Sequence, residues 1–329
     1  MITVELADPA DDAAVAEAAG LLTMFWMEVL GPVDPPVPPA EVADGLRNPP
    51  ANAEELLWLA RDGDEAVGLA VLHVRSGRGN DDRAWVIDLW VRPDRRRRGI
   101  GRQLLDVVVK AARDRGRTIL DGAHPHPHEA GAAFAAAVGA TSELADDQNR
   151  VATADLDRTL LEAWARSAPA GYSIVAWDGP CPDDLVEAFA RLMDVMNTAP
   201  MPDSMNPEIM SVDTVRDGER RILARGGELW RAAARHDATG ELAGYTEMMF
   251  APFKPWLASQ GDTGVTVAHR GHGIGRWLKG TMALRVLDEK PEVGAIETWN
   301  ASSNAHMLAI NHAMGFRRTS QWQEVELSI

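Results

Sequence analysis

The stretch Arg96-Arg97-Arg98-Gly99-Ile100-Gly101-Arg102 recurs 174 positions later as Arg270-Gly271-His272-Gly273-Ile274-Gly275-Arg276. Other identities follow in the same order; chance could supply one such match, but a whole series in order is much harder to dismiss. A collinear series of this kind predicts two copies of one fold. The matched pairs are Asp88 with Asp262, Val91 with Val265, Leu104 with Leu278, Gly68 with Gly244 and Gly139 with Gly315.

The composition is that of a globular chain with room for two domains. Its 329 residues are 46% hydrophobic and 25% charged, and a domain takes about 100–200 residues. Acidic residues outnumber basic ones by 49 to 33, for a net charge of −16. That balance argues against nucleic acid or an anionic membrane as the main partner. The single cysteine, Cys181, excludes an intramolecular disulfide and a cysteine-rich zinc site.

The N-terminus lacks the basic-then-apolar layout of a signal peptide. No apolar run approaches the ~20 residues of a membrane helix. We therefore expect a cytoplasmic protein without a membrane partner.

Both halves show the same alternation of strand and helix patterns, which predicts an α/β fold. We expect two tandem domains, 1–154 and 171–329, joined by a helical connector over 155–170. Each domain would be a central mixed sheet (α+β) flanked by helices. The expected elements include strands over 2–7, 55–60, 65–74, 84–91, 172–177, 229–235, 241–250 and 263–267, with helices over 11–30, 100–115, 128–138, 183–197, 274–288 and 304–314.

Each glycine-rich turn lies where a strand becomes a helix. The first backbone N–H groups of a helix have no partner within it, and the helix dipole is positive there, so the turn suits a phosphate. The spacing excludes a P-loop, and the lack of a third glycine excludes a dinucleotide fingerprint. A plain turn without a ligand is the alternative, and two copies that both begin with arginine make it the weaker one.

The turns resemble the signature of the GNAT superfamily of acyl-CoA-dependent N-acyltransferases, Arg/Gln-x-x-Gly-x-Gly/Ala after the fourth strand. A later family motif, Asn-x-x-Ala-x-x-x-Tyr-x-x-x-Gly-Phe, is approached in the second half. Both halves fit the family's order of elements, so the resemblance covers nearly the whole chain and implies two tandem GNAT domains. The matching residues are Arg96, Gly99, Gly101, Arg270, Gly273, Gly275, Asn304, Met307, Asn311, Gly315 and Phe316.

The resemblance implies acetyl-CoA as the acyl donor. Its pyrophosphate would lie on the turn amides and its pantetheine along the end of the preceding strand. Arginine suits phosphate because its planar fork donates two hydrogen bonds, although a solvated arginine face is the alternative. The implied binding residues are Leu89, Trp90, Val91, Arg96, Arg97, Arg98, Gly99, Ile100, Gly101, Arg102, Thr263, Gly264, Val265, Arg270, Gly271, His272, Gly273, Ile274, Gly275, Arg276 and Asn304.

The tyrosine that often protonates the leaving thiolate in the family is missing from both halves. Ala135 and Asn311 occupy its position. Asn311 can donate a hydrogen bond to sulfur and Ala135 cannot. The second half is therefore the better catalytic candidate, and the first half is expected to bind acyl-CoA without turning it over.

A general base is expected among the acids near the second turn. Asp262 and its counterpart Asp88 begin the strand that leads into each turn, and Glu247 and Glu297 belong to neighbouring strands. Partial burial raises the pKa of a carboxyl group and makes it a better proton acceptor. The alternative for each acid is a strand-end carboxylate facing solvent. Asp262, Glu297 and Asn311 are the catalytic candidates.

These observations and the family resemblance predict an N-acetyltransferase that acts on the amine of a small molecule. Antibiotic or other secondary metabolism is the expected setting of this activity. A non-catalytic acyl-CoA-binding or scaffold protein and a protein-lysine acetyltransferase stay open as alternatives. We expect a monomer or weak dimer with no nucleic-acid partner. The run His124-Pro125-His126-Pro127-His128 lacks acidic or cysteine partners, so we expect a polar loop there and no metal site.

Overall fold

The computed structural model describes residues 1–32, 34–49, 52–77 and 79–329. The chain divides into two compact units. Unit 1 comprises Met1–Ala145, Asp203–Asn206 and Ser320–Ile329, and unit 2 comprises Asp146–Pro202 and Pro207–Thr319. These units differ from the linear halves expected from the sequence, because each contains a strand from the other half.

The strands of unit 1 follow the order β1-β2-β3-β4-β5-β12. Neighbours are antiparallel except for β4 and β5, which are parallel, so the sheet is mixed. The strands are β1 (Ile2–Leu6), β2 (Ala53–Asp62), β3 (Glu65–Arg75), β4 (Arg83–Val91), β5 (Ile119–His126) and β12 (Arg317–Ser328).

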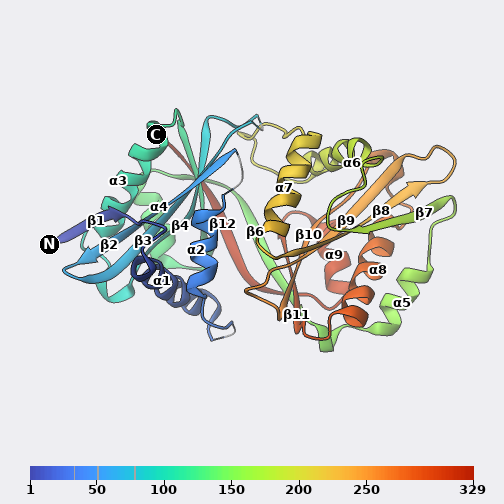
Figure 1. Cartoon of the computed structure of the whole chain (residues 1–329), viewed down its shortest axis with the longest axis horizontal. Helices are drawn as coiled ribbons and strands as arrows, with labels where there is room; N and C mark the ends of the chain where they lie inside the picture. The colour runs from blue at the N-terminus through green and yellow to red at the C-terminus, as the bar shows by residue number, and fades with distance from the viewer. Residues whose placement is uncertain (33, 50–51, 78) are drawn as a thin grey trace. The chain divides into compact units, whose positions relative to one another are not determined.

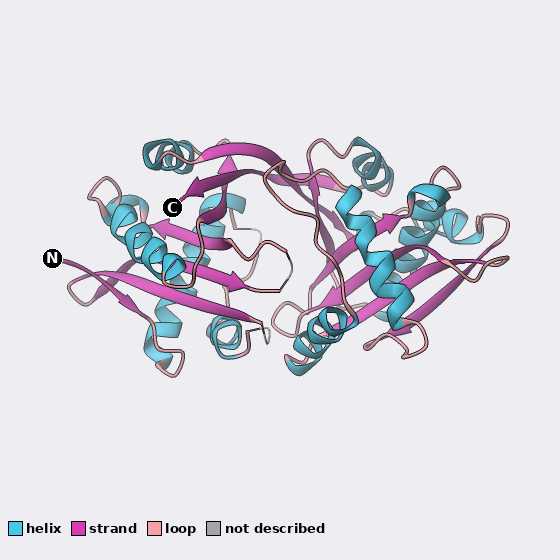
Figure 2. Ribbon diagram, turned by 90° about the horizontal axis from the view of Figure 1, so that it is seen from above, coloured by secondary structure: helices cyan, strands magenta, loops and turns pink. Residues whose placement is uncertain are grey.

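Helices cover both faces of the unit 1 strands, as Figure 2 shows. Side chains alternate along a strand, so Leu57 and Leu59 of β2 pack in one core with α1 and α2. Trp58 and Ala60 pack in the opposite core with α3. The helices are α1 (Asp12–Leu30), α2 (Pro39–Arg47), α3 (Ile100–Arg113) and α4 (Glu129–Val138).

Unit 2 repeats this arrangement with the strand order β6-β11-β10-β9-β8-β7. Only the β10–β11 pair is parallel among the pairs described in it. The strands are β6 (Thr141–Ala152), β7 (Tyr172–Asp178), β8 (Glu228–His236), β9 (Leu242–Phe250), β10 (Leu257–Val265) and β11 (Ala295–Ala301); the helices are α5 (Arg158–Arg166), α6 (Val186–Met193), α7 (Val212–Ala224), α8 (Ile274–Glu289) and α9 (Ala305–Ala313), with a 3-10 turn, η3 (Asp194–Thr198), after α6.

The expected α/β class with a mixed sheet flanked by helices is confirmed. The connector helix α5 packs on unit 2 through Leu161 and Trp164. Gly280 of α8 permits this approach, since a Cβ there would come within 2.8 Å of the Trp164 Cβ. Helices α2 and α7 were not anticipated from the sequence.

The last strand of each half is exchanged. Residues Gln321–Ser328 of β12 pair with β5 in unit 1, and residues Asp146–Ala152 of β6 pair with β11 in unit 2. Figure 1 marks the C-terminus beside α3, in unit 1. The loop expected at His124 and Pro125 is wrong, because β5 continues through these residues opposite Gln323 and Trp322 of β12.

Substitution of Trp322 on β12 offers a test of the strand exchange. It is 9% exposed, and its ring lies 6.0 Å from that of Phe25 and 5.9 Å from that of Trp26, on α1. Trp322→Ala is expected to lower the free energy of unfolding of unit 1 by about 3–5 kcal/mol. Hydrogen exchange should therefore speed up in β5 and not in β10. Trp299→Ala is the control, since Trp299 is 42% exposed; equal loss of protection in both units would contradict the exchange.

Helix α1 has the length and apolar composition of a membrane span, which the sequence analysis did not anticipate. Its buried residues Ala14, Val15, Ala18, Ala19 and Leu21 belong to the core that includes Leu57 and Leu69. The apolar stripe of α1 is therefore used in packing unit 1.

Candidate active site

The two parallel strands of unit 2 separate and leave a cavity between them. β10 and β11 pair only at Leu257–Ser259 with Ala295–Glu297. Beyond this point β10 bulges, so that Gly261 and Asp262 lie between the registered pairs Gln260–Met248 and Thr263–Thr246. A bulge bends a strand and redirects its side chains. The cavity beside it has a volume of about 900 Å³.

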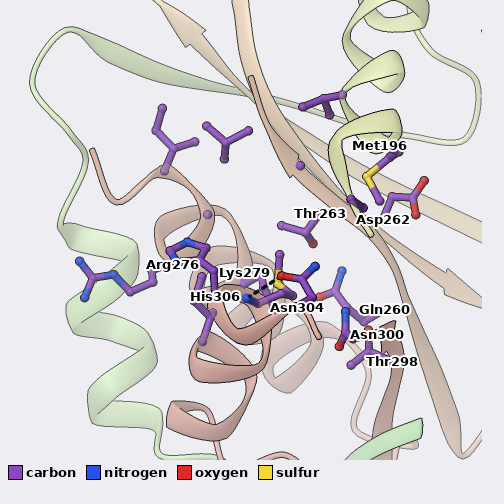
Figure 3. A pocket seen from close by; sticks show the side chains of 18 of the residues that line it. Met196, Gln260, Asp262, Thr263, Arg276, Lys279, Thr298, Asn300, Asn304 and His306 are labelled. Atoms are coloured by element: carbon purple, nitrogen blue, oxygen red, sulfur yellow. Dashed lines mark hydrogen bonds between the residues drawn. The ribbon is translucent and has the colours of Figure 1, made fainter. Parts of the chain in front are cut away.

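The lining of this cavity is rich in polar groups (Figure 3). β10 and β11 supply its floor, α8 and α9 one wall, and η3 another. Gly264 lets η3 approach β10, since a Cβ at this position would collide with Val195. The polar lining residues are Thr198, Ser259, Gln260, Asp262, Thr263, His269, Arg270, Arg276, Lys279, Glu297, Thr298, Trp299, Asn300, Asn304 and His306.

The glycine turn forms an anion seat at the rim of the cavity. Gly273 is the N-cap of α8, with φ +83° and no side-chain cap. The first backbone bond of the helix runs from the Trp277 N–H to the Gly273 carbonyl, so the preceding N–H groups have no partner within the helix. A Cβ at Gly271 would meet nothing within 4 Å. These residues fit a phosphate of a bound ligand. Gly99 of unit 1 has the same conformation, with φ +80°.

The first arginine of each turn bonds to the strand that precedes the turn. The Arg270 Nε donates to the Val265 carbonyl at 3.0 Å, and its Nη2 donates to the Thr198 Oγ1. In unit 1 the Arg96 Nε donates to the Val91 carbonyl at 2.9 Å. Both guanidinium groups therefore hold the turn against its strand. Arg276 is exposed at the second turn and borders the cavity.

Asp262 combines access to the cavity with a perturbed proton affinity. Burial and the negative charge of Glu247 raise the pKa of its carboxyl group to about 6. The Tyr245 hydroxyl donates to Asp262 Oδ2 at 3.1 Å and opposes the rise, as does the charge of Arg231. A carboxyl group with this pKa is mostly ionised at neutral pH and still a competent proton acceptor.

Glu247, whose negative charge raises the pKa of Asp262, belongs to a buried ionic network. The Arg231 guanidinium binds Glu247 at 3.0 Å and Glu219 of α7 at 2.5 Å. All three residues are buried. Removing one member would leave buried charges unpaired, so the network fixes the negative charge that Asp262 experiences.

Glu297 and Asn311 are less well placed than Asp262. Glu297 lines the cavity, but its Oε2 accepts from the Arg150 Nε at 2.5 Å and the Gln148 Nε2 at 2.8 Å. Asn311 is fully buried and donates to the Asn300 Oδ1 at 2.7 Å. Asn311 is not among the residues that line the cavity, and its side-chain amide holds that of Asn300, which does line it. Asn304 borders the cavity as the N-cap of α9.

Unit 1 has a smaller and more apolar cavity of about 460 Å³. The glycines Gly68 and Gly244 lie opposite Val91 and Val265 respectively, which aligns the two sheets. On this alignment Leu57, Leu69 and Val71 stand where unit 2 has Arg231, Tyr245 and Glu247. At these three described positions unit 1 therefore has apolar side chains in place of the polar network. Its apolar lining includes Phe25, Leu89, Leu105, Phe134, Trp322, Val325 and Leu327.

Asp88, the counterpart of Asp262, also lines its cavity. Burial and the charge of Glu55 raise the pKa of its carboxyl group to about 7. Asp88 has no tyrosine beside it, because Leu69 replaces Tyr245.

Glu28 of α1 ties together the groups around the unit 1 turn. Its carboxylate binds Arg96 through two bonds of 2.9 and 2.7 Å, His128 at 2.8 Å and the Trp90 Nε1 at 2.8 Å. Burial disfavours the charge, but these hydrogen bonds outweigh it and lower the pKa of the Glu28 carboxyl to about 2. The cavity is bordered by all three partners of Glu28, namely Arg96, His128 and Trp90. In the structure the terminal nitrogens of Arg96 are bonded to Glu28.

Four residues of the unit 2 site were not predicted from the sequence: Tyr245, Arg231, Glu219 and Lys279. The first three come together only through pairing of β8 with β9 and packing of α7, so no local motif reports them. Lys279 had a signal that was not used: at the spacing of 174 it aligns with Leu105. It is 1% exposed.

The comparisons with known proteins agree on one family. The profile of the acetyltransferase (GNAT) family matches residues 23–139. A tandem GNAT protein from the clavulanic acid biosynthesis pathway is 30% identical, with a TM-score of 0.82 over 100% of this chain and 98% of that one. A GCN5-related N-acetyltransferase from Sphaerobacter thermophilus is 15% identical, with a TM-score of 0.73 over 99% and 95% of the two chains, which is a likeness of fold. No protein of curated function matches the sequence.

Proposed function

Because the chain belongs to the GNAT family and is an acyltransferase, we propose that unit 2 moves an acetyl group from acetyl-CoA to the amine of a small molecule. The observation that carries the proposal is Asp262 at the cavity wall, backed by Tyr245 and the Arg231 network. Unit 1 has apolar residues in place of this network, so it is proposed to bind acyl-CoA without turnover.

The family generally uses acetyl-CoA, whose thioester supplies an activated acyl group. The turn amides of Gly271–Arg276 would hold its pyrophosphate, with Arg276 beside them. The end of β10, Thr263–Val265, would run along its pantetheine. The corresponding residues of unit 1 are Leu89–Val91 and Arg96–Arg102, of which Arg96 holds the turn in shape.

Asp262 would accept a proton from the substrate ammonium, directly or through water, and so leave the neutral amine that attacks. A backbone N–H near Val265 would stabilise the negative charge that develops on the carbonyl oxygen. The nitrogen–carbon bond forms, the carbon–sulfur bond breaks, and the second proton that the nitrogen loses goes through solvent to the thiolate. Asn311 is buried away from the cavity, so no side chain is assigned to the leaving sulfur.

The acceptor is proposed to be a small cationic amine. A cavity of about 900 Å³ is within the range of small-molecule sites, and the net charge of −16 favours cations at long range. The pathway of the 30% identical neighbour supports a role in secondary metabolism. We further propose a cytoplasmic protein, monomeric or weakly dimeric, with no nucleic-acid partner.

Release of free CoA thiol tests the proposal. Purified protein with acetyl-CoA is expected to release CoA only when a suitable amine is added from a panel of amino sugars, aminoglycosides, polyamines and amino acids. Labelling of added lysine-containing peptides alone would favour a protein acetyltransferase. Binding of acetyl-CoA without release across the panel would instead favour the non-catalytic alternative.

A further inference from the structure

Lys279 is a buried cation in the wall of the unit 2 cavity. Its side chain is 1% exposed, and it lies on α8 one turn beyond Gly275, which also lines the cavity. In the view of Figure 3 it is drawn near Asn304 and His306. Burial alone lowers the pKa of its amine to about 7, because no neighbouring charge compensates for the loss of water.

Lys279 has no hydrogen-bond or ion-pair partner within the described ranges. Its one described polar interaction is with the Phe316 ring, whose centroid lies 5.7 Å from Nζ. A buried ammonium without a partner is unfavourable unless a ligand supplies an anion. The cavity in which it lies is the place from which such an anion would come.

Unit 1 shows that the fold does not need this lysine. The corresponding position is Leu105, which lines the unit 1 cavity and is 5% exposed. A leucine therefore fits this place in the same helix of the same fold. The lysine is a property of the ligand site in unit 2 and not of the architecture.

The position of Lys279 favours the acyl end of the ligand over its phosphates. The pyrophosphate seat is at the rim, where Gly271 is exposed, whereas Lys279 contacts Phe316, which is fully buried. Lys279 also belongs to the side of the sheet occupied by α8 and α9, with Ile274 and Ile310 in one core. Tyr245, which holds Asp262, belongs to the opposite core. Lys279 therefore lies on the same side of the sheet as α8, whose N-terminal turn is the proposed phosphate seat, and Tyr245 lies on the other side.

We propose that Lys279 binds a carboxylate on the acyl group of the donor, so that unit 2 uses the CoA thioester of a dicarboxylic acid. The inference rests on the proposed acyl-CoA site in unit 2 and extends the donors of that site from acetyl-CoA to the thioester of a dicarboxylic acid. The transfer keeps the same balance: the amine nitrogen bonds to the thioester carbon, the carbon–sulfur bond breaks, and the distal carboxylate is unchanged in the product.

Calorimetric titration of the full chain tests this with matched ligands. Succinyl-CoA and butyryl-CoA have acyl chains of the same length and differ in the carboxylate, while CoA alone reports the phosphate seat. Titrations are done in the wild type and in Gly99→Asp, which is designed to block the unit 1 seat. We expect succinyl-CoA to bind unit 2 at least about tenfold more tightly than butyryl-CoA, as for one charge-assisted contact.

Lys279→Leu, which copies unit 1, is expected to abolish that preference without weakening CoA, and Lys279→Arg to keep part of it. Lys110→Gln is the control for loss of one positive charge, because Lys110 is exposed on α3. An unchanged melting temperature of Lys279→Leu would show that the fold is intact. If Lys279→Leu weakened the binding of all three ligands equally, Lys279 would be assigned to a CoA phosphate. If it weakened the binding of none of them, Lys279 would contact no part of the ligand. Either result overturns the proposal. Failure of CoA itself to bind would instead reject the acyl-CoA site.

Discussion

Gly273→Asp is expected to weaken CoA binding at unit 2 by at least about 100-fold. The new carboxylate would lie at the N-cap of α8, where the free N–H groups of the helix start would otherwise meet a phosphate. Its negative charge repels that phosphate at close range, and its side chain occupies the space that glycine leaves open. Calorimetric titration with acetyl-CoA should show one site fewer than in the wild type.

The backbone conformation of Gly273 requires a control for strain. With φ at +83°, this residue is in a region that asparagine tolerates better than most side chains. Gly273→Asn has nearly the size and shape of Gly273→Asp without the charge, so it should retain much more of the affinity. Gly99→Asp makes the same change in unit 1. If Gly273→Asp bound acetyl-CoA as tightly as the wild type, the assignment of the turn as a phosphate seat would fail.

Asp262→Asn is expected to lower turnover by about 10²- to 10⁴-fold, the usual contribution of a general base. The amide cannot accept the proton of the attacking amine, but it has nearly the volume of the acid. The dissociation constant of acetyl-CoA should therefore change little. Steady-state kinetics together with calorimetry on the same variant would separate the two quantities. Loss of binding in proportion to turnover would mean that Asp262 shapes the donor site and is not the base.

The pH dependence follows from the pKa of about 6 at Asp262. A base must be deprotonated, so the rate should rise with pH and level off above about 7. Below pH 6 it should fall roughly tenfold per pH unit. Tyr245→Phe removes the hydrogen bond to the ionised carboxylate, so it should shift this acid limb to higher pH. An identical limb in wild type and Tyr245→Phe would exclude Asp262 as the titrating group.

The repeat made the core of the fold predictable. The two glycine turns recur at a fixed spacing and mark the same strand-to-helix junction in each half, which local propensity and backbone chemistry suffice to specify. The equivalent positions of Asp88 and Asp262 were predicted from the same repeat, whereas the bulges beside them and the separation of the parallel strands were not.

The parts that escaped prediction depend on contacts between distant residues. Glu219 is in a charged segment with a glycine at position 218, so the sequence of α7 has a weak helical pattern. The burial of Glu219 depends on its bond to Arg231, a residue of the distant strand β8. The histidine–proline segment is a strand because β12 pairs with it. Lys279 has an ordinary helical environment in sequence, and only alignment with Leu105 reveals that a cation replaces a core leucine.

The exchange of final strands has a consequence for synthesis on the ribosome. His126 pairs with Gln321, so β5 keeps an open edge until nearly the whole chain has been made. An open strand edge invites pairing with other chains, and pairing across so long a segment is slow because loop closure must come first. A fragment ending at residue 154 contains β6 but lacks β12, so the edge of β5 would stay open unless β6 took the place of β12. The order in which the strands emerge therefore leaves the first half to wait for the end of the chain before its sheet is complete.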